Sequence, residues 1–327
     1  MNAKSENLLD VRNLHTHFLT SYGVARAVDG IDFHVAHGET LALVGESGSG
    51  KSVTGLSIMG LIDEPGRIVA GEIRLGGVDL LKLGEKEMDA VRGARIAMIF
   101  QEPMTALDPV YRVGTQIGEA LRIHKQLSRR QAFEHAAELM EKVGIPDPES
   151  RRSAYPHELS GGMRQRVMIA AALACQPEMV IADEPTTALD VTIQAQILDL
   201  INAMKRDTGS AVLLITHDLG VVSQVADRVA VMYAGRLLEI AAVGKIFAAP
   251  RHPYTRGLLA CIPDVDHESE GRRMLPALTG SVPRLYAIPK GCRFRDRCPD
   301  VFEPCTSEPD LIQVAEDHVV RCWLYAN

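Results

Sequence analysis

Short apolar segments separated by turns characterise the chain from residue 8 to about residue 80. Apolar and polar residues alternate along Ile31–Val35, and this period of two predicts a β-strand. Thr40–Val44 is a nearly continuous apolar run, which is typical of a buried strand, and it leads directly into a group of glycines. The N-terminal part of the chain is therefore expected to be rich in β-structure.

The pattern becomes helical between about residues 104 and 174. Ser128 and Gln131 form a capping box, which marks the start of a helix, and Gly144 and Pro146 end the run. Between these signals the apolar residues recur at helical spacing: Phe133, Ala136, Ala137, Met140 and Val143. The whole segment is predicted to be a helical insertion.

Two continuous apolar runs follow the helical segment, at Met179–Ala182 and Ala211–Ile215, with a helix-like stretch between them. Such runs are typical of strands buried on both faces, so we predict a parallel α/β core. Beyond Pro250 the sequence becomes rich in proline, arginine and cysteine, which predicts a separate C-terminal module. No internal repeat is visible, so we expect one copy of the core.

Composition limits the classes of function. With 327 residues, 46% of them hydrophobic, the chain can form one large domain and a smaller appendage. The net charge of −7 arises from interspersed acids and bases, which argues against a nucleic-acid partner. No apolar run approaches the roughly 18 to 20 residues of a membrane span, and the N-terminus is polar, so we expect the chain to stay in the cytosol.

A glycine-rich segment between the predicted strand and a predicted helix matches the P-loop pattern. In such a loop successive backbone N–H groups surround a phosphate at the helix N-terminus, while the lysine reaches the β and γ phosphates and the last serine binds Mg²⁺. Without its flanks the segment would be an ordinary glycine turn. The residues are Gly45, Glu46, Ser47, Gly48, Ser49, Gly50, Lys51 and Ser52. We therefore predict an ATP site.

Acidic residues and a histidine follow the later buried runs. Asp183 and Glu184 come directly after Met179–Ala182, at the strand end where parallel sheets bind ligands. We expect Asp183 to bind Mg²⁺, directly or through water, and Glu184 to act as general base toward the attacking water. His217 ends the next run and is expected to contact the γ-phosphate. Taken alone, each could be a solvated strand end.

Four of the six cysteines lie near the C-terminus: Cys292, Cys298, Cys305 and Cys322. Clustering of this kind in a reducing compartment favours metal ligation over disulfides. The intervals of five, six and sixteen residues match neither a zinc ribbon nor a ferredoxin run. The spacing leaves an iron–sulfur cluster, a zinc ion and unliganded thiols all open, and Cys175 and Cys261 are expected to be ordinary packed thiols.

The segment Leu159–Met163 resembles the signature of ATP-binding-cassette (ABC) transporters. The family usually has glutamine where this chain has Met163, whereas Ser160, Gly161 and Gly162 are present. A serine and bare glycines at a helix start can bind an anion. The resemblance implies that two homologous cassettes pair head to tail, so that the signature of one covers the γ-phosphate held by the P-loop of the other.

Further residues are similar to the family pattern. Gln101 corresponds to the glutamine that senses Mg²⁺ and the attacking water, so the resemblance assigns Ser52, Gln101 and Asp183 to the metal. Asp190 lies in a loop similar to the one that communicates between the paired sites. Tyr22 falls where an aromatic residue stacks on adenine, although a tyrosine in a turn can equally be packing.

The resemblance also implies the fold. We expect an α/β protein made of a P-loop ABC nucleotide-binding domain and a small C-terminal cysteine-bearing module. The first should have a mixed-sheet core, an N-terminal antiparallel β region and a helical subdomain. The expected bounds are residues 8–250 for the ATP-binding domain, with the helical subdomain at about 104–174, and residues 251–327 for the extension.

Narrower features resemble the ATP-binding subunits of bacterial oligopeptide, dipeptide and nickel importers, in particular Arg251–Thr255, Thr186–Thr192 and Gly280–Pro283. This implies two transmembrane permease subunits, a second cassette, an extracytoplasmic solute-binding protein and a peripheral position on the cytoplasmic face of the inner membrane. It also implies a [4Fe-4S] cluster in the tail. A nickel importer and a non-transport ABC ATPase remain the alternatives.

Overall fold

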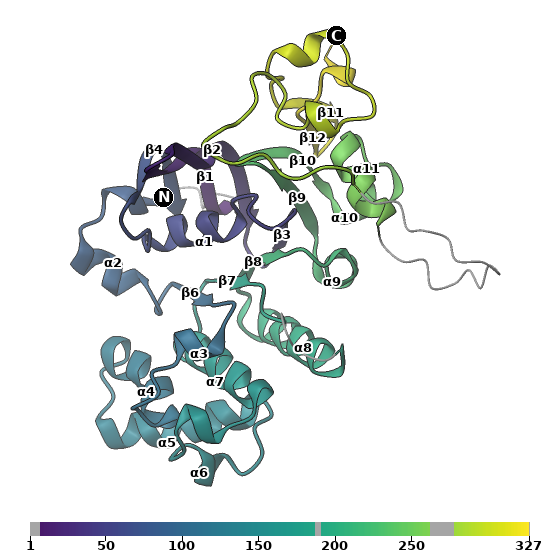
Figure 1. Cartoon of the computed structure of the whole chain (residues 1–327). Coiled ribbons are helices and arrows are strands. Elements are labelled where there is room, and N and C mark those ends of the chain that lie inside the picture. The colour runs from purple at the N-terminus through teal and green to yellow at the C-terminus, as the bar shows by residue number, and fades with distance from the viewer. Residues whose placement is uncertain (1–6, 187–190, 262–277, 327) are drawn as a thin grey trace, which may run out of the picture. The chain divides into compact units, whose positions relative to one another are not determined.

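The computed structural model describes residues 7–186, 191–261 and 278–326 (Figure 1). The chain forms two compact units. Unit 1 consists of Met1–Leu9, Val35–Glu39 and Leu75–Leu214. Unit 2 consists of Asp10–His34, Thr40–Arg74 and Ile215–Asn327.

Unit 1 contains the predicted parallel strands. Strand β6 (Ile96–Ile99) runs parallel to β7 (Met179–Asp183), with Ile96 opposite Met179 and Ile99 opposite Ala182. Strand β8 (Ala211–Thr216) lies on the other side of β7. All three strands are buried along their whole length, as the continuous apolar runs predicted for β7 and β8. Helix α8 (Val191–Thr208) connects β7 to β8.

The other helices of unit 1 lie in two places along the chain, before β6 and between β6 and β7. Helix α2 (Glu85–Val91) precedes β6, and the remaining helices lie between β6 and β7, where the sequence predicts a helical segment. Helix α5 begins at the predicted capping box: the Gln131 N–H donates to Ser128 Oγ at 3.3 Å, and the Ser128 N–H donates to Gln131 Oε1 at 3.0 Å. The helices between β6 and β7 are α3 (Pro103–Ala106), α4 (Val113–His124), α5 (Arg129–Lys142), α6 (Pro148–Arg151) and α7 (Gly161–Leu173).

Unit 2 contains the N-terminal β region. Strand β1 (Asn7–Thr20) lies between β2 (Gly23–Ala36) and β4 (Gly66–Leu75). A two-residue turn joins β1 to β2, so these neighbours form an antiparallel hairpin. Helix α1 (Lys51–Met59) precedes β4. Within the described residues of both units, no helix combines the length and apolar character that crossing a bilayer would require.

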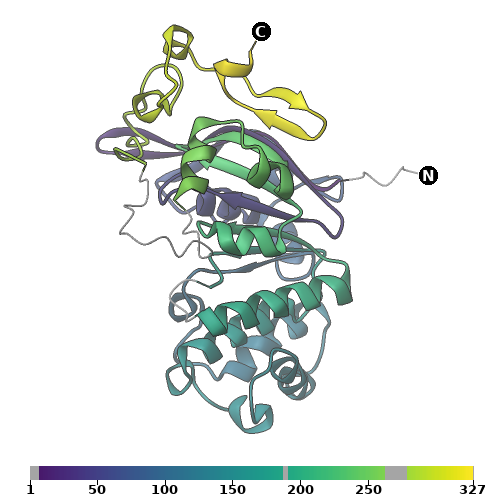
Figure 2. The same ribbon diagram turned by 90° about the vertical axis from the view of Figure 1, so that its right-hand side faces the viewer.

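A second sheet in unit 2 includes part of the C-terminal tail, which comprises the described residues 278–326. Strand β9 (Arg228–Tyr233) pairs in parallel with β3 (Thr40–Val44) and antiparallel with β10 (Arg236–Ala242). The hairpin of β11 (Ile312–Ala315) and β12 (His318–Val320) continues the sheet, because β12 pairs with β10 (Figure 2). The tail therefore forms no separate sheet: it covers the edge that β10 would otherwise expose.

The tail also shares its hydrophobic core with the rest of unit 2. Tyr233 of β9, Tyr254 of α11 (Pro253–Ala260) and Phe294 of the tail are fully buried. Their ring centroids lie 4.7 to 5.4 Å apart in tilted and edge-on arrangements, which are the favourable geometries for aromatic rings. Cys292 and Cys305 join the same cluster. Shorter elements around it are α9 (Leu219–Val225), α10 (Val243–Ala248), η3 (Arg295–Arg297), η4 (Glu303–Thr306) and η5 (Trp323–Tyr325).

A buried carboxylate anchors the segment before α11. Glu239 of β10 is completely buried and accepts the backbone N–H groups of Arg251 and His252 at 2.7 and 2.9 Å. It also lies 2.8 Å from His318 Nε2. His252 caps α11, because its Nδ1 accepts the Tyr254 N–H at 3.0 Å. Burial, with a smaller effect of Arg256, lowers the pKa of His252 to about 3 from its ordinary value of 6.5.

The His252 cap should make stability depend on pH. As the pH falls below about 6.5, the unfolded chain takes up a proton here that the folded chain binds only near pH 3, so acid lowers the free energy of unfolding. His252→Asn keeps a capping acceptor and does not titrate. In urea unfolding, the destabilisation caused by this substitution should be smaller at about pH 4.5 than at about pH 7. An equal difference at both pH values would contradict the assignment.

Candidate nucleotide-binding site

The glycine-rich loop connects a buried strand to a helix, as the sequence predicts. Strand β3 ends at Val44, and α1 begins at Lys51. Gly45 and Gly50 have φ values of 156° and 110°. A Cβ atom on Gly45 would lie 2.1 Å from the Met232 carbonyl oxygen, and one on Gly50 would lie 2.1 Å from that of Ala27. Only glycine therefore allows the loop to pack this closely against its neighbours.

The polar groups of the loop suit a phosphate. The buried Lys51 side chain directs its Nζ into the loop, where it donates to the carbonyl oxygens of Gly45 and Glu46 at 2.8 and 3.1 Å. Ser49 Oγ is buried and has no hydrogen-bond partner among the described residues. Ser52 lies in the first turn of α1, whose N-terminus favours negative charge. An ammonium group, an unsatisfied hydroxyl and a helix N-terminus thus fit ATP and Mg²⁺.

Glu46 uses its side chain differently from its neighbours in the loop. Its carboxylate accepts two hydrogen bonds from the Arg297 guanidinium, at 2.6 and 2.9 Å. Its backbone N–H donates to the Tyr254 hydroxyl at 2.9 Å. Sequence reasoning missed both partners. Tyr254 lies in the Arg251–Thr255 segment that the sequence analysis singled out, whereas nothing local indicates Arg297.

In unit 1 the structure brings three predicted residues together at one sheet edge. Gln101 lies just beyond β6, and Asp183 and Glu184 lie at the end of β7. Because these strands are parallel neighbours, their carboxyl ends meet, and Gln101 Nε2 donates to Glu184 Oε2 at 3.0 Å. Asp183 is buried. Glu184 has a φ of 44°, a left-handed conformation that is unfavourable for glutamate and is found at functional sites.

The predicted signature forms the start of α7, also in unit 1. Ser160 is the N-cap, and its hydroxyl accepts the Met163 N–H at 3.3 Å. A Cβ on Gly161 would meet nothing within 4 Å, so the surface at this helix N-terminus is open. Gln165 in the next turn is buried and donates to the Pro185 carbonyl at 2.7 Å. The signature helix is therefore bonded to the loop that follows Glu184, a connection that the sequence analysis missed.

The remaining predicted residues are separate. His217 directly follows β8 and is exposed, next to Asp218, which caps α9. Tyr22 lies in the β1–β2 turn with 77% of its surface exposed, and it stacks on Tyr286 at a centroid distance of 5.5 Å. Asp190 lies outside the described residues. The P-loop, Tyr22 and His217 belong to unit 2.

Comparisons with known proteins agree with this arrangement. The ABC transporter family model matches residues 28–187, and the model for the C-terminal region of oligopeptide/dipeptide transporters matches residues 238–305. The oligopeptide transport ATP-binding protein AppD of Bacillus subtilis is 52% identical over 320 residues, which cover 97% of each chain. The chain belongs to the ABC transporter ATP-binding protein family. It is the ATP-hydrolysing subunit of such a transporter.

Two further proteins are similar to this ABC protein. A probable peptide ABC transporter ATP-binding protein of Sinorhizobium fredii, y4tR, is 53% identical over 98% of this chain and 96% of its own length. Among solved structures, the ATP-binding cassette MJ0796, a dimer in a post-hydrolysis state bound to ADP and Pi, has a TM-score of 0.66. It is 24% identical and covers 72% of this chain and 98% of its own, which shows the fold.

Three of the four tail cysteines of this ABC subunit, Cys292, Cys298 and Cys305, belong to one hydrophobic cluster. Cys292, Cys305 and Cys322 are buried, Cys298 is half-buried, and none of them forms a disulfide. The Cys292 N–H donates to the Cys305 carbonyl at 3.0 Å. Burial, together with the other three thiols, raises the pKa of Cys292 to about 11. Neutral thiols are therefore favoured unless a cationic group compensates the thiolates.

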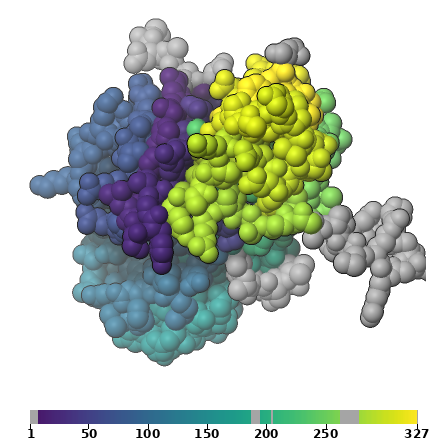
Figure 3. Space-filling model, turned by 45° about the horizontal axis from the view of Figure 1, so that its top comes forward, coloured from purple at the N-terminus to yellow at the C-terminus, as the bar shows by residue number. Residues whose placement is uncertain are grey.

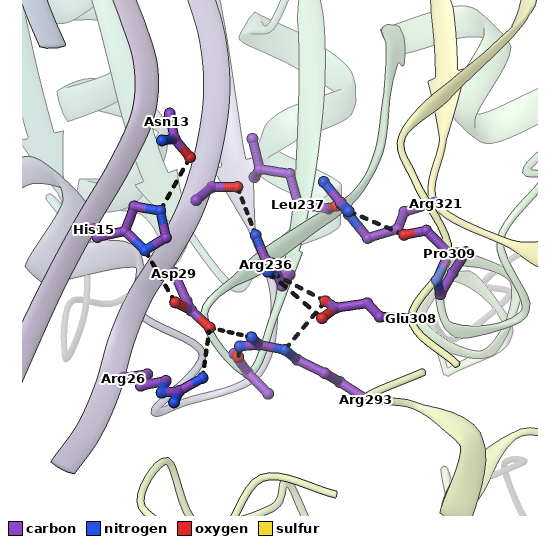
Figure 4. Close-up of polar contacts among 12 residues, drawn as sticks. Asn13, His15, Arg26, Asp29, Arg236, Leu237, Arg293, Glu308, Pro309 and Arg321 are labelled. Atoms are coloured by element: carbon purple, nitrogen blue, oxygen red, sulfur yellow. Dashed lines mark hydrogen bonds and ion pairs between the residues drawn. The ribbon is translucent and has the colours of Figure 1, made fainter. Parts of the chain in front are cut away.

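The arginines between these cysteines have different roles. Arg295 is partly exposed and bonds to the Lys290 carbonyl and to Asp296. Arg297 pairs with Glu46 of the P-loop. Arg293 is buried, and its guanidinium donates to the Asp29 carboxylate of β2 (Figure 4). Arg293 and Arg297 therefore each neutralise an acidic side chain of the ATP-binding core.

His15, His17 and Asp29 have ligand atoms within 4.8 Å of one another. The Asp29 carboxylate already forms ion pairs, because its Oδ2 pairs with Arg293 and lies 3.8 Å from Arg26 (Figure 4). These arginines would repel a divalent cation. Asp29 has its pKa lowered to about 2 by Arg293, against the opposing effect of burial. The group is an ion-pair network, in which His15 and His17 lie 3.0 and 3.4 Å from Asp29 Oδ1.

Proposed function

We propose that this chain is the ATPase subunit of an importer of di- or oligopeptides. The observation that carries the proposal is the match of residues 238–305 to the C-terminal region of oligopeptide/dipeptide transporters, on a chain that also has an ABC ATPase domain. The names of its relatives support it, since AppD is an oligopeptide transport protein. The tail is integral to unit 2, where β12 pairs with β10.

In this proposal the P-loop binds the triphosphate of ATP. Lys51, already inside the loop, exchanges its carbonyl partners for the β and γ phosphates. The metal ion, Mg²⁺, neutralises phosphate charge, and Ser52, Gln101 and Asp183 would hold it. Tyr22 would stack on the adenine. The remaining loop residues, Gly45 to Gly50, would surround the phosphates with backbone N–H groups, except for Glu46, whose N–H donates to the Tyr254 hydroxyl.

Glu184 is the proposed general base. Its carboxylate takes a proton from the attacking water, and the Gln101 amide at 3.0 Å orients that carboxylate. The strained backbone at Glu184 fixes its direction. His217 would hold the γ-phosphate, and Ser160, Gly161 and Gly162 of a second cassette would cover it. Asp190 would connect the two paired sites.

The proposed complex contains other proteins. A homologous cassette would pair head to tail with this one, and two transmembrane permeases would form the pore. An extracytoplasmic solute-binding protein would deliver the peptide. The chain would then lie at the cytoplasmic face of the inner membrane. Residues 8–250 would form the ATP-binding domain, with the helical subdomain at about 104–174, and residues 251–327 the extension.

We also propose that the four tail cysteines hold a [4Fe-4S] cluster. Three of these cysteines are buried and the fourth is half-buried, and the other three thiols help to raise the pKa of Cys292. Buried, clustered thiols of this kind need a cationic group before they can become thiolates. A cluster supplies cationic iron that stabilises thiolates, and Cys292, Cys298, Cys305 and Cys322 would be its ligands.

Removing the base should separate ATP binding from turnover. Glu184→Gln is nearly isosteric and cannot accept the proton, so steady-state phosphate release should fall by about 10² to 10⁴-fold. ATP should remain bound and stabilise a cassette pair, visible as a larger species in size-exclusion chromatography with ATP. Glu178→Gln, in an exposed ion pair with Arg95, is the control and should keep normal turnover. Full turnover by Glu184→Gln would remove Glu184 from this role.

Peptide uptake tests the cargo. Vesicles containing this chain, its permeases, the second cassette and the binding protein should accumulate labelled di- or oligopeptides when ATP is inside. Lys51→Ala should abolish uptake, because the loop then lacks its ammonium group. Arg295→Gln should transport normally. Accumulation of nickel ions in place of peptides would assign the other cargo.

The cluster predicts iron in the protein. Anaerobically purified chain should be brown and contain about four iron and four sulfide per chain. Cys305→Ser should lose most of this iron, because it removes a buried proposed ligand. Cys175→Ser, in the helical part of unit 1, should keep it. A colourless, iron-free anaerobic preparation would refute the proposal, and stoichiometric zinc would replace it.

A further inference from the structure

Arg297 joins the cysteine-bearing tail directly to the P-loop. It precedes Cys298 in the chain, and its two terminal nitrogens bond to the two carboxylate oxygens of Glu46 at 2.6 and 2.9 Å. Such a bidentate pair of parallel hydrogen bonds fixes both the distance and the orientation of the two side chains. The arginine side chain is 6% exposed, so solvent screens the pair only weakly. Its guanidinium also lies over the rings of Tyr233 and Phe294.

The same P-loop residue is held at its backbone. The Tyr254 hydroxyl accepts the Glu46 N–H at 2.9 Å, and Lys51 Nζ donates to the Glu46 carbonyl at 3.1 Å. Tyr254 is fully buried in the aromatic cluster that includes Phe294 of the tail. The first turn of the loop therefore rests on groups whose positions depend on the tail.

Arg293 provides a second connection. Its guanidinium donates to the Ala234 carbonyl and to Asp29 (Figure 4). Ala234 and Gly235 form the turn between β9 and β10, and the Gly235 N–H donates to the Ser49 carbonyl of the P-loop at 2.8 Å. The tail segment thus supports the loop at Glu46 and at Ser49. Figure 3 shows part of the tail, in yellow-green, packed beside the purple N-terminal part of the chain.

We propose that Arg297 is a positioning residue through which the segment Cys292–Cys298 sets the ATP affinity of the P-loop. Arg293 contributes to the same effect through its contacts with Ala234 and Asp29. Both arginines lie inside this segment, so a change in how Cys292 and Cys298 are held moves them. The inference rests on the proposed ATP site. It assigns the tail a control over nucleotide binding in addition to any cluster that the cysteines hold.

The sign of the effect follows from charge. Glu46 lies beside the site of a triphosphate, and Arg297 neutralises it. When Arg297 is lost, the carboxylate is uncompensated and repels ATP, and the loop also loses its bidentate anchor. ATP affinity should therefore fall. Neutralising Glu46 at the same time should remove the repulsion.

Equilibrium binding of a fluorescent ATP analogue to the full chain tests the proposal. Arg297→Gln should raise its Kd about tenfold, the equivalent of about 1.4 kcal/mol for one charge-assisted pair. The double variant Arg297→Gln with Glu46→Gln should recover most of the affinity, which a merely structural role for Arg297 would not produce. Arg295→Gln is the matched control from the same segment and should bind like wild type, because the Arg295 side chain bonds to the Lys290 carbonyl and to Asp296 and not to the P-loop.

The link to the cysteines needs a second pair of variants. Cys298→Ser should weaken binding in the wild-type background and add nothing in the Arg297→Gln background, because both act through the same contact. Cys261→Ser, outside the tail segment, should leave the affinity unchanged. If Arg297→Gln does not fold, Arg297→Lys is measured instead. Lysine keeps the charge but cannot form the bidentate pair of hydrogen bonds, so this variant should give an intermediate Kd.

Two results would overturn the proposal. One is wild-type ATP affinity in folded Arg297→Gln, and the other is an additive effect of Cys298→Ser in that background. Both presuppose that the wild-type chain binds the analogue. A wild-type chain that binds none at all would refute the ATP site itself, so the two failures can be told apart.

Discussion

The close approach of the P-loop to its neighbouring backbone is the constraint on which the rest of the site depends. Gly45 and Gly50 press against the carbonyl oxygens of Met232 and Ala27, with no room for a Cβ. The loop therefore takes its shape from β9 and from β2, and these strands are in turn held by the tail. Anything that shifts them shifts the groups that surround the phosphates.

The tail is part of this support. Strand β12 extends the sheet at β10, and Phe294 completes an aromatic cluster with Tyr233 and Tyr254. Glu239 accepts hydrogen bonds from the segment before α11 and so holds it in place. Buried ion pairs are expensive unless both partners are well bonded, and here Arg293 and Arg297 each have an acid and further hydrogen-bond partners. Membership of the ABC family thus explains the loop, and the tail explains how the loop is held.

Local patterns in the sequence were sufficient for much of the fold. The buried runs at β3, β7 and β8, the capping box at Ser128 and the serine cap at Ser160 were all correctly predicted. Each depends on residues close together in the chain, where strand and helix periods and capping geometry act. The parallel pairing of β6 and β7 then brings Gln101 to Glu184, because neighbouring parallel strands end at one edge.

The sequence by itself therefore determined the elements, the P-loop and the order of its chemical groups. Only the tertiary structure decided the use of Glu46, which belongs to a phosphate motif but pairs with an arginine 251 residues away. It likewise decided that Arg293 compensates Asp29 while Arg295 stays at the surface. The physical reason is that a charged side chain bonds to whatever packing places beside it, and chain spacing carries no record of contacts between distant segments.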